Sequence, residues 1–302
     1  MSRSAAGGWA IAALLVGVIG ISFASPLAKL AVQGSDVGWI GAAFWRTTLA
    51  LPILWTVLLL TRSPARPAQR EPRLAWWPLL IPGALFAGDL LTWHLSFAWT
   101  TAASATLLAN LAVVLVGLAG WWWLRERLDC RYVIGAVLAV GGVFWLVTAA
   151  TGPADHPLRL RGDLLAMLTA VFYAGYILSI KVLRSDHTAI MLMCIGTSAS
   201  ACILFLAVVA SDEHLVPNSI EAWGWLALLA IVPHCLGQGL IVWSLSTLPA
   251  SMAAVTLLLQ PVATSVWGWL MLGEALGPSQ ITAGLVVIAG IVLARLGSMR
   301  AP

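Results

Sequence analysis

The sequence predicts an all-α integral membrane protein with ten transmembrane helices, arranged as two inverted five-helix repeats. Three observations carry this prediction. Of the 302 residues, 61% are hydrophobic and only 9% are charged, whereas soluble domains carry about 25% charged residues. The apolar residues gather into stretches that approach the roughly 20 residues needed to cross a bilayer. One long stretch also occurs twice, 150 positions apart.

The expected spans follow the chain with short connections. In the first half they are 9–31, 37–60, 75–97, 102–124 and 131–150. In the second half they are 161–181, 188–210, 221–247, 250–272 and 279–297. We therefore expect the first repeat to occupy residues 1–150 and the second to occupy residues 151–302. The first apolar run has no small-residue cleavage site, which favours a membrane span over a signal peptide.

The duplicated stretch extends from Trp93 to Glu126 and returns from Trp243 to Glu274. Its polar and aromatic positions carry the match, because Trp93, Ser96, Thr106 and Asn110 fall on Trp243, Ser246, Thr256 and Gln260. Each repeat has an odd number of spans, so the second repeat enters the membrane from the opposite side. Inverted pairs of this kind are typical of alternating-access transporters, whose sites lie near the bilayer midplane at the repeat interface.

The basic residues predict the orientation of the chain. Alternate loops, counted from the N-terminus, hold 12 of the 16 lysines and arginines, while Arg159 and Arg161 lie in the opposite set. The positive-inside rule then places both termini in the cytoplasm. Because the net charge of +4 is explained by these loops, it does not indicate a nucleic-acid partner. We expect a multi-pass protein of the cytoplasmic (inner) membrane, in contact with membrane lipids.

Several positions resemble a known transporter family. Each repeat has a small-residue helix, a loop glutamate and a glycine-containing helix, with Glu126 and Glu274 as the glutamates. Phe23, Lys29 and Arg46 also stand where the EamA family of the drug/metabolite transporter superfamily often has an aromatic residue, a lysine and an arginine. Within that superfamily the chain resembles exporters of the YddG type. The resemblance implies export of amino acids, aromatic or apolar ones among them, and related metabolites.

Two predicted spans contain helix-breaking residues at equivalent places. The span 75–97 contains Pro82, Gly83 and Gly88, and the span 221–247 contains Pro233 and Gly237, among others. Proline and glycine release backbone groups that neighbours or cavity water must satisfy. We interpret the matched set as the wall of a cavity; simple helix bending is the alternative, since both residue types are common in membrane helices.

Matched amides are the sharpest candidates for substrate binding. Asn110 follows Thr106 by one helical turn, and Gln260 follows Thr256 in the same way, so each pair shares a helix face. A primary amide both donates and accepts hydrogen bonds, and hydrogen bonding between helices is the alternative role. The full set of predicted substrate-binding residues is His94, Thr106, Asn110, Tyr173, Trp243, Thr256 and Gln260.

Other ionisable groups in the spans have open roles. His94 could bind substrate or relay a proton, or it could be a helix-end residue at the membrane interface. Asp89 lies in mid-helix and must pair with a basic group or face water. Arg46 lies within a turn or two of the start of its span, and we expect its side chain to extend toward the membrane interface. Glu126 and Glu274 are expected to accept hydrogen bonds from backbone groups in loops.

Motifs for other functions are absent from the sequence. It has no phosphate-binding glycine loop and no HExxH zinc motif, and the four cysteines have no metal-ligand spacing. We therefore expect no metal, no cofactor and no enzymatic activity, and a small-molecule substrate handled by a monomer or homodimer. The alternatives are efflux of drugs or other metabolites, a membrane-embedded lipid-modifying enzyme, and a structural membrane protein.

Overall fold

The computed structural model describes residues 3–61, 76–96, 99–100, 105, 108–126, 128–150, 158–211, 213–273 and 276–298. Within these ranges the elements are helical, apart from one isolated bridge between Val37 and His214. Nine helices in the described ranges are long and apolar enough to cross a membrane, and a tenth, Ala112–Trp122, is shorter. The predicted all-helical membrane class is confirmed.

The first half contains α1 (Arg3–Ser22), α2 (Ala24–Gln33), α3 (Trp39–Thr48), α4 (Ala50–Thr61), η1 (Trp77–Leu80), α5 (Ile81–Ser96), α7 (Ala112–Trp122) and α8 (Cys130–Ala150). The second half contains α9 (Arg159–Leu183), α10 (Ala189–Val209), α11 (Ile220–Leu229), η2 (Ala230–Gln238), α12 (Gly239–Ser244), α13 (Ala250–Leu257), α14 (Leu259–Leu272) and α15 (Pro278–Ser298). Several spans are therefore built from two or three consecutive helices.

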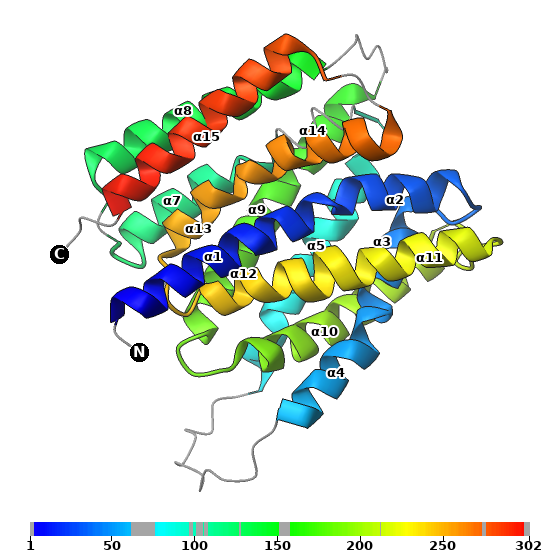
Figure 1. Cartoon of the computed structure of the whole chain (residues 1–302). Helices are drawn as coiled ribbons and strands as arrows, with labels where there is room; N and C mark the ends of the chain where they lie inside the picture. Colours follow the sequence, from blue (N-terminus) through cyan, green and yellow to red (C-terminus); the bar gives the residue numbers. More distant parts are fainter. Residues whose placement is uncertain are drawn as a thin grey trace, which may run out of the picture.

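Helix packing repeats itself between the halves. Helix α5 of the first half packs against α9, and its counterpart in the second half, α11–η2–α12, packs against α1 and α2. Helix α7 packs against α9, while its counterpart, α13 and α14, packs against α1. Each of these contacts joins one half to the other, as expected for an inverted pair. The two halves thus form one bundle rather than two separate bodies (Figure 1).

Helices α8 and α15 form one edge of the bundle, with α4 at the opposite edge (Figure 1). The backbones of α8 and α15 approach each other closely at glycines. A Cβ atom added to Gly135 would lie 2.3 Å from the Ala294 nitrogen, and one added to Gly290 would lie 2.5 Å from the Ala139 nitrogen. Small residues permit this approach between membrane helices, which then pack by van der Waals contact.

The break between α1 and α2 has a chemical cause. Pro26 has no N–H with which to bond the Ser22 carbonyl four residues before it. The Thr264 hydroxyl, from α14, donates a hydrogen bond of 2.9 Å to that carbonyl. The Trp267 indole, one turn further along α14, donates to the Ser22 hydroxyl at 2.8 Å. A neighbouring helix therefore satisfies the group that proline releases, as a membrane interior requires.

The two spans predicted to be interrupted behave differently. Helix α5 is continuous from Ile81 to Ser96, since Pro82 is its second residue and needs no backbone N–H there. In the other half, Ala230–Gln238 is a π-helix with Pro233 inside it. The prediction of an interruption within the span is therefore right for the second half, whereas in the first half the helix changes type only near its start, where η1 meets α5.

Helix α1 begins and α15 ends at the same end of the bundle (Figure 1). An even number of membrane crossings produces this arrangement. The predicted fourth span, 102–124, is described at residue 105 and from residue 108 onward, and its described helix α7 begins at Ala112.

Candidate functional site

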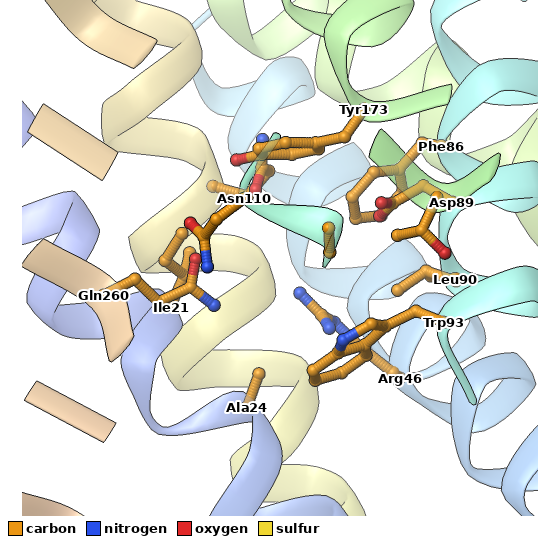
Figure 2. A pocket seen from close by; sticks show the side chains of 13 residues that line it. Ile21, Ala24, Arg46, Phe86, Asp89, Leu90, Trp93, Asn110, Tyr173 and Gln260 are labelled. Carbon is orange, nitrogen blue, oxygen red and sulfur yellow. The ribbon is translucent and has the colours of Figure 1, made fainter. Parts of the chain in front are cut away.

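A cavity of about 80 Å³ lies between the two halves. The first half contributes Ile21, Ala24, Arg46, Phe86, Asp89, Leu90, Trp93, Ala109 and Asn110, and the second half contributes Thr169, Tyr173, Gln238 and Gln260. The lining mixes two charged groups, three amides and three aromatic rings (Figure 2). This composition fits a site that orients a small polar solute by a few well-placed groups.

A larger cavity of about 710 Å³ lies between α7 and α8, but its character differs. Its walls are almost entirely apolar, and Val114, Trp121 and Phe144 among them are exposed by 44%, 61% and 57%. Such a surface on a membrane helix faces lipid tails. The small polar cavity at the repeat interface is therefore the candidate functional site.

The two predicted amides meet at this cavity. Asn110 lies in a turn directly before α7, and Gln260 is the second residue of α14, directly after the break at Leu258. Figure 2 shows their side chains approaching each other on one side of the cavity. Helix interruptions beside a binding site are typical of transporters, and here they occur in the amide-bearing spans. That these amides bind substrate stays a prediction.

Tyr173 also lines the cavity, as expected for a substrate-binding residue. Its ring stacks on Tyr176 with centroids 6.1 Å apart. Within the described residues its buried hydroxyl has no hydrogen-bond partner. A buried polar atom without a partner is costly, so this hydroxyl is available to a solute in the cavity.

Arg46 was expected to extend toward the membrane interface, and this expectation is wrong. The side chain is only 5% exposed, and its guanidinium carbon lies 5.7 Å from the centroid of the Phe86 ring. It lines the cavity together with Asp89 of α5 (Figure 2). The sequence count placed Arg46 near the start of its span, but it did not reveal that α3 turns this position toward the centre.

His94 lies behind the cavity rather than in it. The residue is buried, and its Nδ1 atom is 2.6 Å from the Leu90 carbonyl oxygen. Its ring contacts Trp93 edge-on at 5.1 Å and lies 6.4 Å from Trp39. Since the lining of the cavity includes Trp93 but not His94, His94 is placed to support Trp93.

Two further predicted residues, Trp243 and Thr256, are not brought to the cavity. Trp243 is 45% exposed on the outer surface, because Ile241, Val242 and Ser244 of the same short helix point inward and are fully buried. Thr256 is buried, donates to the Met252 carbonyl at 2.8 Å, and borders a separate cavity of about 150 Å³. Thr106 lies outside the described residues.

Gln238 is a functional candidate that the sequence analysis missed. It is 2% exposed, lines the cavity, and donates from Nε2 to the Tyr176 hydroxyl at 3.0 Å. Thr169 of α9 was also missed, and its hydroxyl lies 2.8 Å from that of Thr92. An amide shortly after the proline of a span was a usable signal for Gln238, whereas a threonine in an apolar helix is too common to stand out.

Glu126 stabilises the hairpin before α13, which confirms its predicted loop-anchoring role. It accepts hydrogen bonds from the backbone nitrogens of Ala250 at 2.7 Å and Ser251 at 3.1 Å. From α9, Lys181 donates to the carbonyls of Leu245 and Leu248 in the same hairpin, at 3.0 and 2.7 Å. A carboxylate and an ammonium group thus hold opposite polar ends of one turn. Glu274 lies outside the described residues.

Relatives and solved structures agree with this architecture. The chain is 27% identical over 261 residues to an uncharacterized transporter from Archaeoglobus fulgidus, covering 83% of this chain and 86% of that one. It is 28% identical over 218 residues to the pseudopaline exporter CntI of Pseudomonas aeruginosa, covering 72% and 74%. It is 23% identical over 288 residues to a probable terminal-alkyne amino-acid exporter of Streptantibioticus cattleyicolor, covering 94% and 92%.

One solved crystal structure has the same fold, with a TM-score of 0.78, 20% identity and 99% coverage of both chains. The model of the EamA-like transporter family matches the chain twice, over residues 8–148 and 160–296. These two matches fall on the two halves of the bundle. The chain is therefore a multi-pass membrane transporter for small molecules rather than an enzyme, and it belongs to the EamA-like transporter family.

Proposed function

We propose that this chain exports small organic solutes, amino acids and related metabolites foremost, across the cytoplasmic membrane by alternating access. The observation that carries the proposal is the polar cavity between the halves, lined by residues of both. In the proposed cycle, the repeats 1–150 and 151–302 exchange conformations around this cavity. Both termini face the cytoplasm, and the chain acts as a monomer or homodimer.

The size of the cavity favours small solutes over drugs. Sites for drug-sized ligands occupy about 300–1,000 Å³, whereas this cavity measures about 80 Å³. Two relatives are named as exporters, one of pseudopaline and one, with the word probable, of a terminal-alkyne amino acid. The second of these names supports export of amino-acid-like solutes. Efflux of drugs or other metabolites is the second candidate, and it would require a considerably wider cavity than this conformation has.

The first test is counterflow of labelled solutes in liposomes that contain the purified protein. The proposal expects flux of one or more amino acids without chemical change. Failure of every amino acid and metabolite in the panel to exchange, with correctly folded protein in the liposomes, would reject it. A periplasm-only reporter fused at Pro302 tests the orientation, and an active reporter would contradict the cytoplasmic C-terminus.

The second test concerns the amide pair. Asn110→Leu and Gln260→Met keep side-chain bulk and remove hydrogen bonds. A binding role predicts that affinity falls by about 0.5–1.5 kcal/mol, or about twofold to tenfold, with an unchanged melting temperature. Gln33→Met, at the exposed end of α2, is the matched control. Lower melting temperatures with unchanged affinity would assign the amides a structural role instead.

A further inference from the structure

Two side chains of opposite charge line the cavity. Arg46 comes from α3 and Asp89 from α5, and both border the same space of about 80 Å³ (Figure 2). In the described part of the chain no ion pair joins them. A charged group inside a membrane protein is costly unless it is paired or hydrated. Two opposite charges that border one small cavity without forming an ion pair therefore leave binding capacity that a solute can use.

The Arg46 guanidinium is built to receive an anion. It is 95% buried, and among the described residues its Nε atom has no hydrogen-bond partner. The Phe86 ring lies 5.7 Å from the guanidinium carbon and restricts its position. A guanidinium offers planar, paired donors that match the two oxygens of a carboxylate. Figure 2 shows it directed toward the space in front of Asn110 and Gln260.

Asp89 offers the opposite chemistry from the neighbouring helix. It follows Phe86 by three residues and precedes Trp93 by four, so all three occupy one face of α5. An ionised carboxylate only accepts hydrogen bonds, which suits an ammonium group. The aromatic rings on either side add the favourable contact that such rings make with cations. The side chain of Tyr173, which carries a buried hydroxyl, lines the same space.

We propose that the cavity is a zwitterion site, in which Arg46 binds the carboxylate and Asp89 the ammonium group of an α-amino acid. The inference rests on the proposed export function and assigns the recognition of its substrate. A bound zwitterion pairs both buried charges at once and leaves the net charge of the cavity at zero. A solute that lacks one of the two groups leaves one protein charge buried and unpaired, which is strongly unfavourable. The site therefore selects zwitterions by penalising anything else.

The first experiment compares ligands on the unmodified full-length protein. The twenty proteinogenic amino acids are tested by counterflow, and the one with the largest signal is compared with its primary amide and its deaminated acid. For leucine these would be leucinamide and 4-methylpentanoate. The zwitterion should bind at least about tenfold more tightly than either analogue, because each analogue strands one charge. If either analogue bound as tightly as the amino acid, the inference would be overturned.

The second experiment uses charge-neutral variants. Arg46→Gln should lose the preference for the amino acid over its amide, and Asp89→Asn should lose the preference over the deaminated acid. The double variant Arg46→Gln/Asp89→Asn carries neither charge, so it remains informative if the single variants fold poorly. A site role predicts that the double variant folds and binds the zwitterion at least about tenfold more weakly. A double variant that binds like the parent would show a purely structural pair and overturn the inference.

Two control variants remove charges outside the cavity, and two different outcomes distinguish failure of the zwitterion inference from failure of the export proposal. Asp186→Asn and Arg295→Gln remove exposed charges of the same types, and both should leave binding and flux unchanged. Export of solutes that lack a carboxylate or an ammonium group, with no preference for zwitterions, would overturn the inference and leave the export proposal standing. Absence of flux for every solute in the panel would reject the export proposal itself.

Discussion

Helix α5 and its counterpart α11–η2–α12 occupy equivalent places in the two halves, yet they present different residues to the cavity. Trp93 lines the cavity, whereas the matched Trp243 is 45% exposed on the outer surface. The difference arises at the π-helix, because a widened turn contains an extra residue and rotates all later side chains by about 100°. Two spans with similar sequences thus present different side chains to the cavity.

The position of proline explains why only one of the two helices is widened. Pro82 is the second residue of α5, where a missing N–H costs nothing. Pro233 follows the start of its span at Ile220 by more than three turns, so its missing N–H must be accommodated. The π-turn does so while bringing Gln238 into the cavity. One residue type therefore has two effects, depending on its distance from the helix start.

The largest expected effect is the loss of stability on replacing the glycines at which these two spans pack closely against neighbouring helices. A Cβ atom at Gly83 would lie 2.3 Å from the Gly196 carbonyl oxygen, and one at Gly237 would lie 2.7 Å from the Ile21 nitrogen. Each Gly→Ala variant should lose about 1–3 kcal/mol of stability or fail to fold. Gly224→Ala, with open space around it, is the control. Melting temperatures in detergent measure the effect, and three equal values would refute the close-packing explanation.

The second prediction removes the cause of the asymmetry. Pro233→Ala restores a backbone N–H, so the π-helix should tighten and rotate Gln238 away from Tyr176. We expect transport to fall at least about tenfold, as a displacement of roughly 1 Å at a site can do, while the protein still folds. Pro82→Ala, near the start of α5, should retain transport. Similar counterflow rates for the two variants would show that the widened turn is unimportant.

A third, smaller effect concerns the hydrogen bonds that each span makes beside the cavity. Gln238→Leu removes the 3.0 Å bond to Tyr176 and an amide that faces the solute. Thr92→Val removes the 2.8 Å contact with Thr169, and Thr92 itself is not among the residues that line the cavity. Each change should lower stability by about 1 kcal/mol, but only Gln238→Leu should also weaken substrate binding. Melting temperature and substrate affinity, measured on the same samples, separate the effect on stability from the effect on binding. Weaker binding in both variants would contradict the prediction.

The smallest expected effect is that of Trp243→Leu. Its side chain points outward, so stability should change by no more than about 0.5 kcal/mol and transport should be unchanged. Trp93→Leu, at the matched position, should weaken substrate affinity because this ring lines the cavity. Substrate affinity is measured for both variants. An equal loss of affinity in both would show that Trp243 also contributes to the binding site.

Much of the fold was predictable because bilayer physics acts on sequence patterns. A membrane span needs about 20 apolar residues, and this requirement locates the helices to within a few positions. The repeat was visible because polar and aromatic residues such as Asn110 and Gln260 recur at one spacing. The carboxylate of Glu126 was correctly assigned to a loop, since its position directly after an apolar span leaves it near backbone groups of a turn.

By itself, then, the sequence determined the helical membrane class, the duplication and the amide pair that the structure brings together at the cavity. Only the tertiary structure decided which side chains face that cavity. The orientation of a side chain depends on every turn before it, and one π-turn moved Trp243 outward and Gln238 inward. Packing of α3 against α5 likewise buried Arg46 near Asp89. Helix periodicity read from a sequence assumes a regular helix, and a transporter site forms where the helices depart from regularity.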